Sequence, residues 1–132
     1  MSKFLSVEEF TTPCPVCVSP KTSLSSVSNL MNKHGIRHIT VVDNAIPVGV
    51  ISERDLRVVE KFPAWVSFQV GDVMTKDPYS VSYDEKIDAV ALEMSRRKIG
   101  SAVVLNEVGE IFGIFTTTDA LNALVEIVRG EV

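Results

Sequence analysis

The sequence predicts an α/β fold made of two copies of one β-α-β-β-α unit. Three observations lead to this prediction: the chain is similar to itself at a shift of 63 residues, each copy carries a helical apolar pattern followed by two β-branched runs, and each copy ends in a second helical pattern. A unit of about 60 residues buries a limited share of its surface when it folds alone. We therefore expect the two units to pack face to face in pseudo-twofold fashion.

The repeat emerges when the segment that starts at residue 15 is set over the segment that starts at residue 78. Identical residues then meet at seven positions: Pro15 and Pro78, Val18 and Val81, Ser19 and Ser82, Val27 and Val90, Met31 and Met94, Ile36 and Ile99, Val41 and Val104. With one residue inserted in the second copy, Gly49 meets Gly113 and Asp55 meets Asp119. We expect the first domain to span residues 1–63 and the second to span 64–132.

Each copy should open with a short strand, at 16–19 or 79–82, and continue into a helix. Gly35 should end the first of these helices in a left-handed conformation, because glycine adopts positive φ without steric cost. Two β-branched runs follow in each copy, at 39–42 with 48–51 and at 102–105 with 111–115. A turn rich in Asp, Asn and Gly joins the two runs, which is typical of a hairpin.

Each copy should close with a helix that begins near Ser52 or Thr116. In the last helix, four residues at helical spacing should form the apolar face: Leu121, Leu124, Val125 and Val128. The segment 60–75 joins the copies and contains the large apolar residues Phe62, Trp65, Val66 and Phe68. It is too apolar for a flexible linker, so we expect it to pack against both copies.

Composition places the chain among ordinary globular proteins, with 45% hydrophobic and 23% charged residues in 132. The N-terminus offers no signal-peptide core, and no uncharged apolar run approaches the roughly 18 residues of a membrane span. We expect a cytoplasmic protein without a membrane partner. A net charge of −4 argues against nucleic acid as a partner, because such binding depends on many Lys and Arg contacts to phosphate.

The charge is distributed unevenly between the two copies. Residues 1–63 hold seven basic and six acidic side chains, whereas residues 64–132 hold six basic and eleven acidic ones. The two halves therefore carry +1 and −5, and an anionic ligand should prefer the first.

The motifs "GVISERD" and "GIFTTTD" occupy matching places in the two copies. In each, Ser52 or Thr116 precedes Asp55 or Asp119 by three positions, which is the spacing of a helix capping box. The same geometry suits a nucleotide: a helix start and a hydroxyl can donate to phosphate, and an ionised carboxylate can accept from two ribose hydroxyls. The residues alone leave both interpretations open, since a duplicated fold also duplicates its caps.

Several longer motifs together resemble a tandem pair of cystathionine β-synthase (CBS) domains, a Bateman module. They are "GIRHITVVD" followed by "PVGVISERDL", "DVMTKDPYSVS", and "KIGSAVVLNEVGEIFGIFTTTDAL", and the resemblance covers residues 12–128. It implies a regulatory module that binds an adenosine-containing ligand, such as AMP, ADP, ATP, S-adenosylmethionine or NAD, in clefts between the paired domains. The adenine nucleotide would be a regulatory ligand and not a catalytic cofactor. The resemblance also implies a homodimer whose state is read by a separate effector protein.

The resemblance further implies which residues would contact the nucleotide. Asp55 and Asp119 would hold ribose, and Ser52 and Thr116 would lie near phosphate. Adenine would rest between residues of the first strand region and of the hairpin entrance: Val16, Ile36 and His38 in one copy, and Tyr79, Ile99 and Ser101 in the other. Arg37 and Arg54 would add positive charge to the first site, whereas Thr118 replaces Arg54 in the second, so the first site should hold a polyphosphate better.

Two features depart from what the family usually shows or from its repeat. The family often has proline where Thr40 and Val103 stand, which should affect strand entry more than binding. Cys14 and Cys17 form a Cys-x-x-Cys pair that could indicate redox chemistry, but they fall on Asp77 and Ser80 in the second copy. Because that copy does the same structural job without sulfur, a wall of the nucleotide site is the favoured interpretation and a redox switch the less favoured one.

No catalytic or metal-binding pattern stands out in the sequence. It offers no supported Ser-His-Asp arrangement and no phosphate loop of the Walker type. His34 and His38 are four apart, but Gly35 between them breaks the helix that a two-histidine zinc site would need. We expect a protein that is not an enzyme. The alternative to ligand sensing is a ligand-free oligomerisation or docking module, in which Ser52 and Thr116 are only helix caps.

Overall fold

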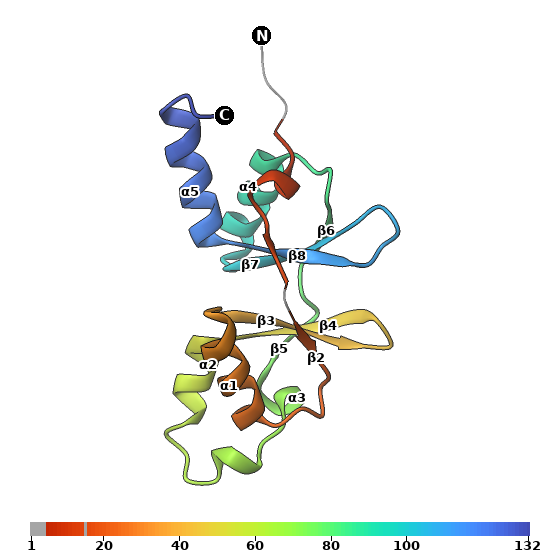
Figure 1. Cartoon of the computed structure of the whole chain (residues 1–132), viewed down its shortest axis with the longest axis vertical. Coiled ribbons are helices and arrows are strands. Elements are labelled where there is room, and N and C mark those ends of the chain that lie inside the picture. The colour runs from red at the N-terminus through yellow and green to blue at the C-terminus, as the bar shows by residue number, and fades with distance from the viewer. Residues whose placement is uncertain (1–4, 15) are drawn as a thin grey trace. The chain divides into compact units, whose positions relative to one another are not determined.

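The computed structural model describes residues 5–14 and 16–132, so Pro15 of the repeat alignment lies outside the described residues. The first copy contains β2 (Cys17–Val18), α1 (Leu24–His34), β3 (His38–Asp43), β4 (Ile46–Ser52) and α2 (Glu53–Val59). The second contains β6 (Ser80–Ser82), α4 (Ile87–Arg97), β7 (Ser101–Leu105), β8 (Ile111–Thr116) and α5 (Thr117–Val128). The predicted β-α-β-β-α order is confirmed in both (Figure 1).

Five further elements precede the two copies or join them. They are the 3-10 helices η1 (Val7–Phe10) and η2 (Trp65–Ser67), the short helix α3 (Val70–Val73), and the strands β1 (Thr12–Pro13) and β5 (Thr75–Lys76). β1 pairs antiparallel with β8 of the second copy, and β5 pairs antiparallel with β4 of the first. The sheets therefore run β2-β3-β4-β5 and β6-β7-β8-β1.

The compact units of the structure differ from the expected limits at residue 63. One unit is Cys14–Pro78, which we call the first-copy unit; the other, the second-copy unit, is Tyr79–Val132 with the N-terminal segment up to Pro13. The difference arises because the segment that precedes the first copy packs with the second copy, and the segment that precedes the second copy packs with the first. The amide of Val7 donates to the carbonyl of Glu85 at 2.8 Å, and the amide of Val70 donates to the carbonyl of Thr22 at 2.8 Å.

The predicted end of the first long helix is confirmed. Gly35 has φ 63° and ψ 35°, and its amide donates to the carbonyl of Met31, as in a left-handed helix cap. Lys98 takes the same place and conformation in the second copy, with φ 56°. A side chain at positive φ costs free energy, so this turn is imposed on Lys98 by the surrounding fold.

Each unit has its own hydrophobic core between its sheet and its helices. Leu24, Val27 and Met31 of α1 face the first core, and the equivalent α4 residues face the second: Ile87, Val90 and Met94. The core of each unit also takes in a valine from the segment that precedes the other copy: Val70 in the first core and Val7 in the second. Both are completely buried.

This placement predicts that Val7, outside the repeat seen in the sequence, is needed for stability of the second-copy unit. We expect Val7→Ala to cost about 2 kcal/mol in the free energy of unfolding, from lost burial and the cavity left behind. For a chain of 132 residues this lowers the melting temperature by about 7 °C. Val108→Ala is the matched control, because Val108 is 74% exposed. Calorimetry that finds equal melting temperatures for the two variants would contradict this role.

The expected apolar face of the last helix does not face the core of the second-copy unit. All four residues named for it, Leu121, Leu124, Val125 and Val128, are between 45 and 76% exposed. α5 instead packs on the second core through Ala120 and Ala123, and Ala123 is 2% exposed. Small side chains let the helix approach closely, which turns its larger apolar residues outward.

The connecting segment is also placed differently from the expectation. Five of its side chains pack in the core of the first-copy unit: Trp65, Phe68, Val70, Val73 and Met74. Phe62 and Val66 remain more than half exposed. The segment therefore belongs to one unit, because it carries β5, which pairs with β4. Within the described residues, none of the helices is long and apolar enough to cross a membrane.

Candidate functional site

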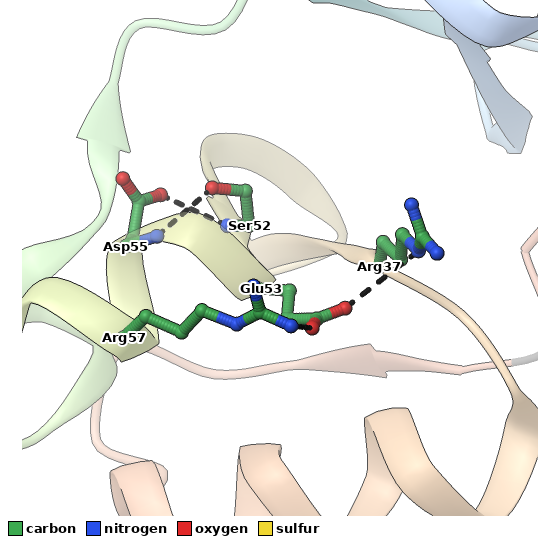
Figure 2. Close-up of polar contacts among 5 residues, drawn as sticks. All are labelled: Arg37, Ser52, Glu53, Asp55 and Arg57. Atoms are coloured by element: carbon green, nitrogen blue, oxygen red, sulfur yellow. Dashed lines mark hydrogen bonds and ion pairs between the residues drawn. The ribbon is translucent and has the colours of Figure 1, made fainter. Parts of the chain in front are cut away.

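The start of α2 carries the first of the two matching motifs, and it forms a complete capping box (Figure 2). The Ser52 hydroxyl oxygen accepts from the amide of Asp55 at 3.1 Å, and the carboxylate of Asp55 accepts from the amide of Ser52 at 2.9 Å. Both side chains are half-buried. Ser52 and Asp55 therefore cap α2, and any role in binding a ligand must be compatible with these two hydrogen bonds.

Three arginines lie near this helix start, and two of them are engaged. Arg37 Nε lies 3.7 Å from Glu53 Oε2, and the Arg57 guanidinium pairs with the same carboxylate from one turn along the helix (Figure 2). Exposed pairs of this kind add little stability. Arg54 is exposed, and no ion pair holds it within the described part of the chain. Arg54 is therefore the cation most available to an anionic ligand.

The hairpin entrance lies beside the start of α2. His38 begins β3 directly opposite Ser52 in the antiparallel pairing, and the amide of Glu53 donates to the carbonyl of Arg37 at 2.8 Å. Ile36 and Val16 are half-buried and pack against the first core. Val16 comes just before β2, which pairs with β3 from its other edge.

A surface cavity of about 500 Å³ lies on the same unit, and of the motif residues 49–55 Glu53 alone lines it. It is lined by residues of α1, of α2 and of the loop between α1 and β3, including Met31, Leu56, Ile36 and Arg37. Ser52, Arg54 and Asp55 are not among its lining residues. Of the predicted site residues, the cavity therefore gathers Ile36 and Arg37 alone.

The second motif starts α5 in the same way. Asp119 accepts from the amide of Thr116 at 2.9 Å and from its hydroxyl at 3.1 Å, while the amide of Asp119 donates back to that hydroxyl at 3.3 Å. Ser101 begins β7 opposite Thr116, as His38 does opposite Ser52. Thr118 is exposed.

The residues of the second copy that are predicted to contact adenine are also half-buried. Tyr79 and Ile99 pack against the second core. The Arg97 guanidinium carbon lies 4.6 Å from the centroid of the Tyr79 ring, a cation–π geometry. Burial raises the pKa of the Tyr79 hydroxyl, with Glu85 and Glu93 adding to it.

The carboxylates of Asp55 and Asp119 differ in how many of their oxygens already accept hydrogen bonds from the protein. The second oxygen of Asp119 accepts from the Thr12 hydroxyl at 3.1 Å. Asp55 accepts through one oxygen only among the described residues, and the Ser52 hydroxyl proton has no acceptor there. The first motif therefore keeps one carboxylate oxygen and one hydroxyl donor for a ligand.

Thr12 is a residue that the sequence reasoning did not include in either site. A signal was available, because the 63-residue shift continues upstream: Val7 falls on Val70 and Thr12 falls on Thr75. Among the described residues, no cluster of three or more His, Cys, Asp or Glu side chains could hold a metal ion. His34, in the last turn of α1, is exposed.

Comparisons with known proteins identify the fold. The model of the CBS domain matches residues 7–60 and 70–126. The chain is 34% identical over 104 residues to inosine-5'-monophosphate dehydrogenase of Korarchaeum cryptofilum; the match covers 79% of this chain but 21% of that enzyme. The match to a CBS domain thus points to a regulatory module and not to a catalytic domain.

Solved structures agree along nearly the whole chain. The structure of CBSX2 in complex with AMP is 26% identical, with a TM-score of 0.76, and covers 94% of this chain and 98% of that one. The CBS domain pair of MJ0100, in complex with 5-methylthioadenosine and S-adenosylmethionine, is 23% identical, with a TM-score of 0.79 and coverage of 98% and 100%, and supports the fold. With a family match in each copy, this chain belongs to the CBS-domain family.

Proposed function

We propose that this chain is a regulatory module that binds an adenine nucleotide, with the stronger site at the start of α2. The observation that carries the proposal is the start of α2 itself, where Asp55 keeps an unused carboxylate oxygen beside the Ser52 hydroxyl and the unpaired Arg54. The relative CBSX2, similar over nearly its full length, is in complex with AMP and supports adenine nucleotides as the ligand class.

The roles in this site follow from hydrogen-bonding chemistry. The Asp55 carboxylate accepts from the two vicinal ribose hydroxyls, while Ser52 and Arg54 donate to phosphate. α2 has seven residues, so the site depends on these side chains more than on a helix dipole. Ile36, His38 and Val16 offer an apolar and aromatic surface to adenine. In the second copy, Thr116, Asp119, Tyr79, Ile99 and Ser101 take the same roles, and Thr118 supplies no charge.

A homodimer belongs to the same proposal. The exposed face of α5, with Leu121, Leu124, Val125 and Val128, is an apolar surface of the kind that a second copy covers. A nucleotide would regulate a separate effector protein by favouring one arrangement of such a dimer, to the extent that it binds that arrangement more tightly.

The test is calorimetry of the full chain with AMP, ADP, ATP, S-adenosylmethionine and NAD in turn. A ligand present at about 100 times its dissociation constant stabilises the fold by about 2.7 kcal/mol. For 132 residues this raises the melting temperature by about 10 °C. Adenine-free ribose 5-phosphate at equal concentration is the control and should raise the temperature less, because it lacks the adenine contacts. If no panel member shifts it at millimolar concentration, the chain is instead a docking module.

A further inference from the structure

Cys14 and Cys17 lie close together at the entry to the first-copy sheet, although the second copy has no sulfur there. Cys17 is in β2, paired with Thr40 of β3, and the Cys14 sulfur lies 3.8 Å from the Thr40 hydroxyl oxygen. Thr40 is completely buried, so both cysteines contact one fixed residue. Both thiols therefore lie beside the Thr40 side chain, and neither is in a disulfide.

The two thiols are not equivalent. The hydrogen bond from Cys14 lowers the pKa of Cys17 to about 7, against burial, which opposes the shift. The same hydrogen bond raises the pKa of Cys14, and burial adds to the rise. One thiol is thus partly ionised near neutral pH while its neighbour stays protonated, a division of roles typical of reactive Cys-x-x-Cys pairs.

We propose that Cys14 and Cys17 form a redox-responsive dithiol site that small-molecule disulfides oxidise to an intramolecular disulfide. The proposal does not depend on nucleotide binding. Both thiols are half-buried, so a small reagent can reach them. The proposal departs from the interpretation favoured from the repeat, because Asp77 and Ser80 of the second copy carry no thiols and so give no information on the reactivity of two neighbouring ones.

The chemistry proceeds in two exchanges. The Cys17 thiolate attacks one sulfur of the reagent disulfide, which forms a mixed disulfide and releases one reagent thiolate that takes up a proton. Cys14 then loses its proton to solvent, and its sulfur attacks the Cys17 sulfur, forming the Cys14–Cys17 bond and releasing the second reagent thiolate. The protein loses two electrons and two protons, and the reagent is reduced to two thiols.

The size of the reactivity difference can be estimated. At pH 7 a thiol of pKa about 7 is about half ionised, whereas one at the ordinary value of 9.0 is about 1% ionised, a gain of about 50-fold. The lower basicity of the Cys17 sulfur reduces its nucleophilicity by about tenfold. Cys17 should therefore react about fivefold faster than an ordinary thiol, and Cys14 more slowly than one.

The experiment uses the reduced full chain with oxidised glutathione at pH 7, followed by intact mass and free-thiol titration. The wild type should lose two hydrogens and both thiols, without retaining glutathione. Cys14→Ser keeps a hydroxyl donor beside Cys17 and should stop at one bound glutathione. Cys17→Ser keeps the thiol whose pKa burial raises, and it should react at least about fivefold more slowly than Cys14→Ser. Serine is close to cysteine in size, and circular dichroism checks that each variant is folded. Retention of one or two glutathiones by the wild type, or equal rates in the two variants, would overturn the proposal.

Discussion

Gly113→Ala should destabilise the fold strongly. Among the glycines with negative or extended φ, it should be the most costly one to replace by alanine. A Cβ at Gly113 would lie 2.3 Å from the Thr12 carbonyl oxygen and 2.8 Å from a Thr11 side-chain carbon. The carbonyl is part of β1, so relief requires the strand to move away from β8. We expect a loss of about 3 kcal/mol, which lowers the melting temperature by about 10 °C, measured by calorimetry.

Two other glycines provide matched comparisons. At Gly49, the equivalent position, the added Cβ would meet the Met74 sulfur at 2.4 Å and the Thr75 carbonyl at 2.9 Å. The Met74 side chain can move, so Gly49→Ala should cost about half as much. Gly100→Ala brings a contact of 3.5 Å and should be close to neutral. A different order of the three melting temperatures would show that the β1–β8 contact does not limit stability.

Asp55→Ala should weaken nucleotide binding by about 10- to 100-fold, because hydrogen bonds to a charged group contribute about 1.5–3 kcal/mol. Asp119→Ala should weaken it less, about threefold, since Asp119 already accepts from Thr12 and has less capacity to offer. Isothermal titration with the panel member that stabilises most would give both values. Equal effects, or a larger effect of Asp119→Ala, would contradict the proposed ranking of the sites.

The comparison needs a control for lost capping. Each substitution removes a carboxylate that accepts from the helix N-cap amide, which costs about 1 kcal/mol of stability by itself. Asp72→Ala removes the same kind of bond, to the amide of Gln69, at the start of α3. It should lower the melting temperature by a similar amount and leave nucleotide affinity unchanged.

The capping box of each candidate site was predictable because it depends on local geometry. The spacing from Ser52 to Asp55 fixes a capping box within one helical turn, and the structure forms it with bonds of 2.9 and 3.1 Å. Gly35 ends its helix for an equally local reason, its tolerance of positive φ. The repeat pairs Thr12 with Thr75, but it does not say that Thr12 lies beside Asp119 of the other copy, because that contact depends on how the N-terminal segment packs.

The sequence by itself determined the repeat, the order of helices and strands, and the residues at the two helix starts, because each of these depends on periodicity and on contacts within a few positions. Tertiary structure decided three other features: Val7 completes the second core, α5 packs through Ala123, and Cys14 and Cys17 both lie beside Thr40. Each depends on which surfaces pack together. Neither hydrophobic pattern nor spacing specifies that choice, since an apolar residue at helical spacing can face a core or solvent.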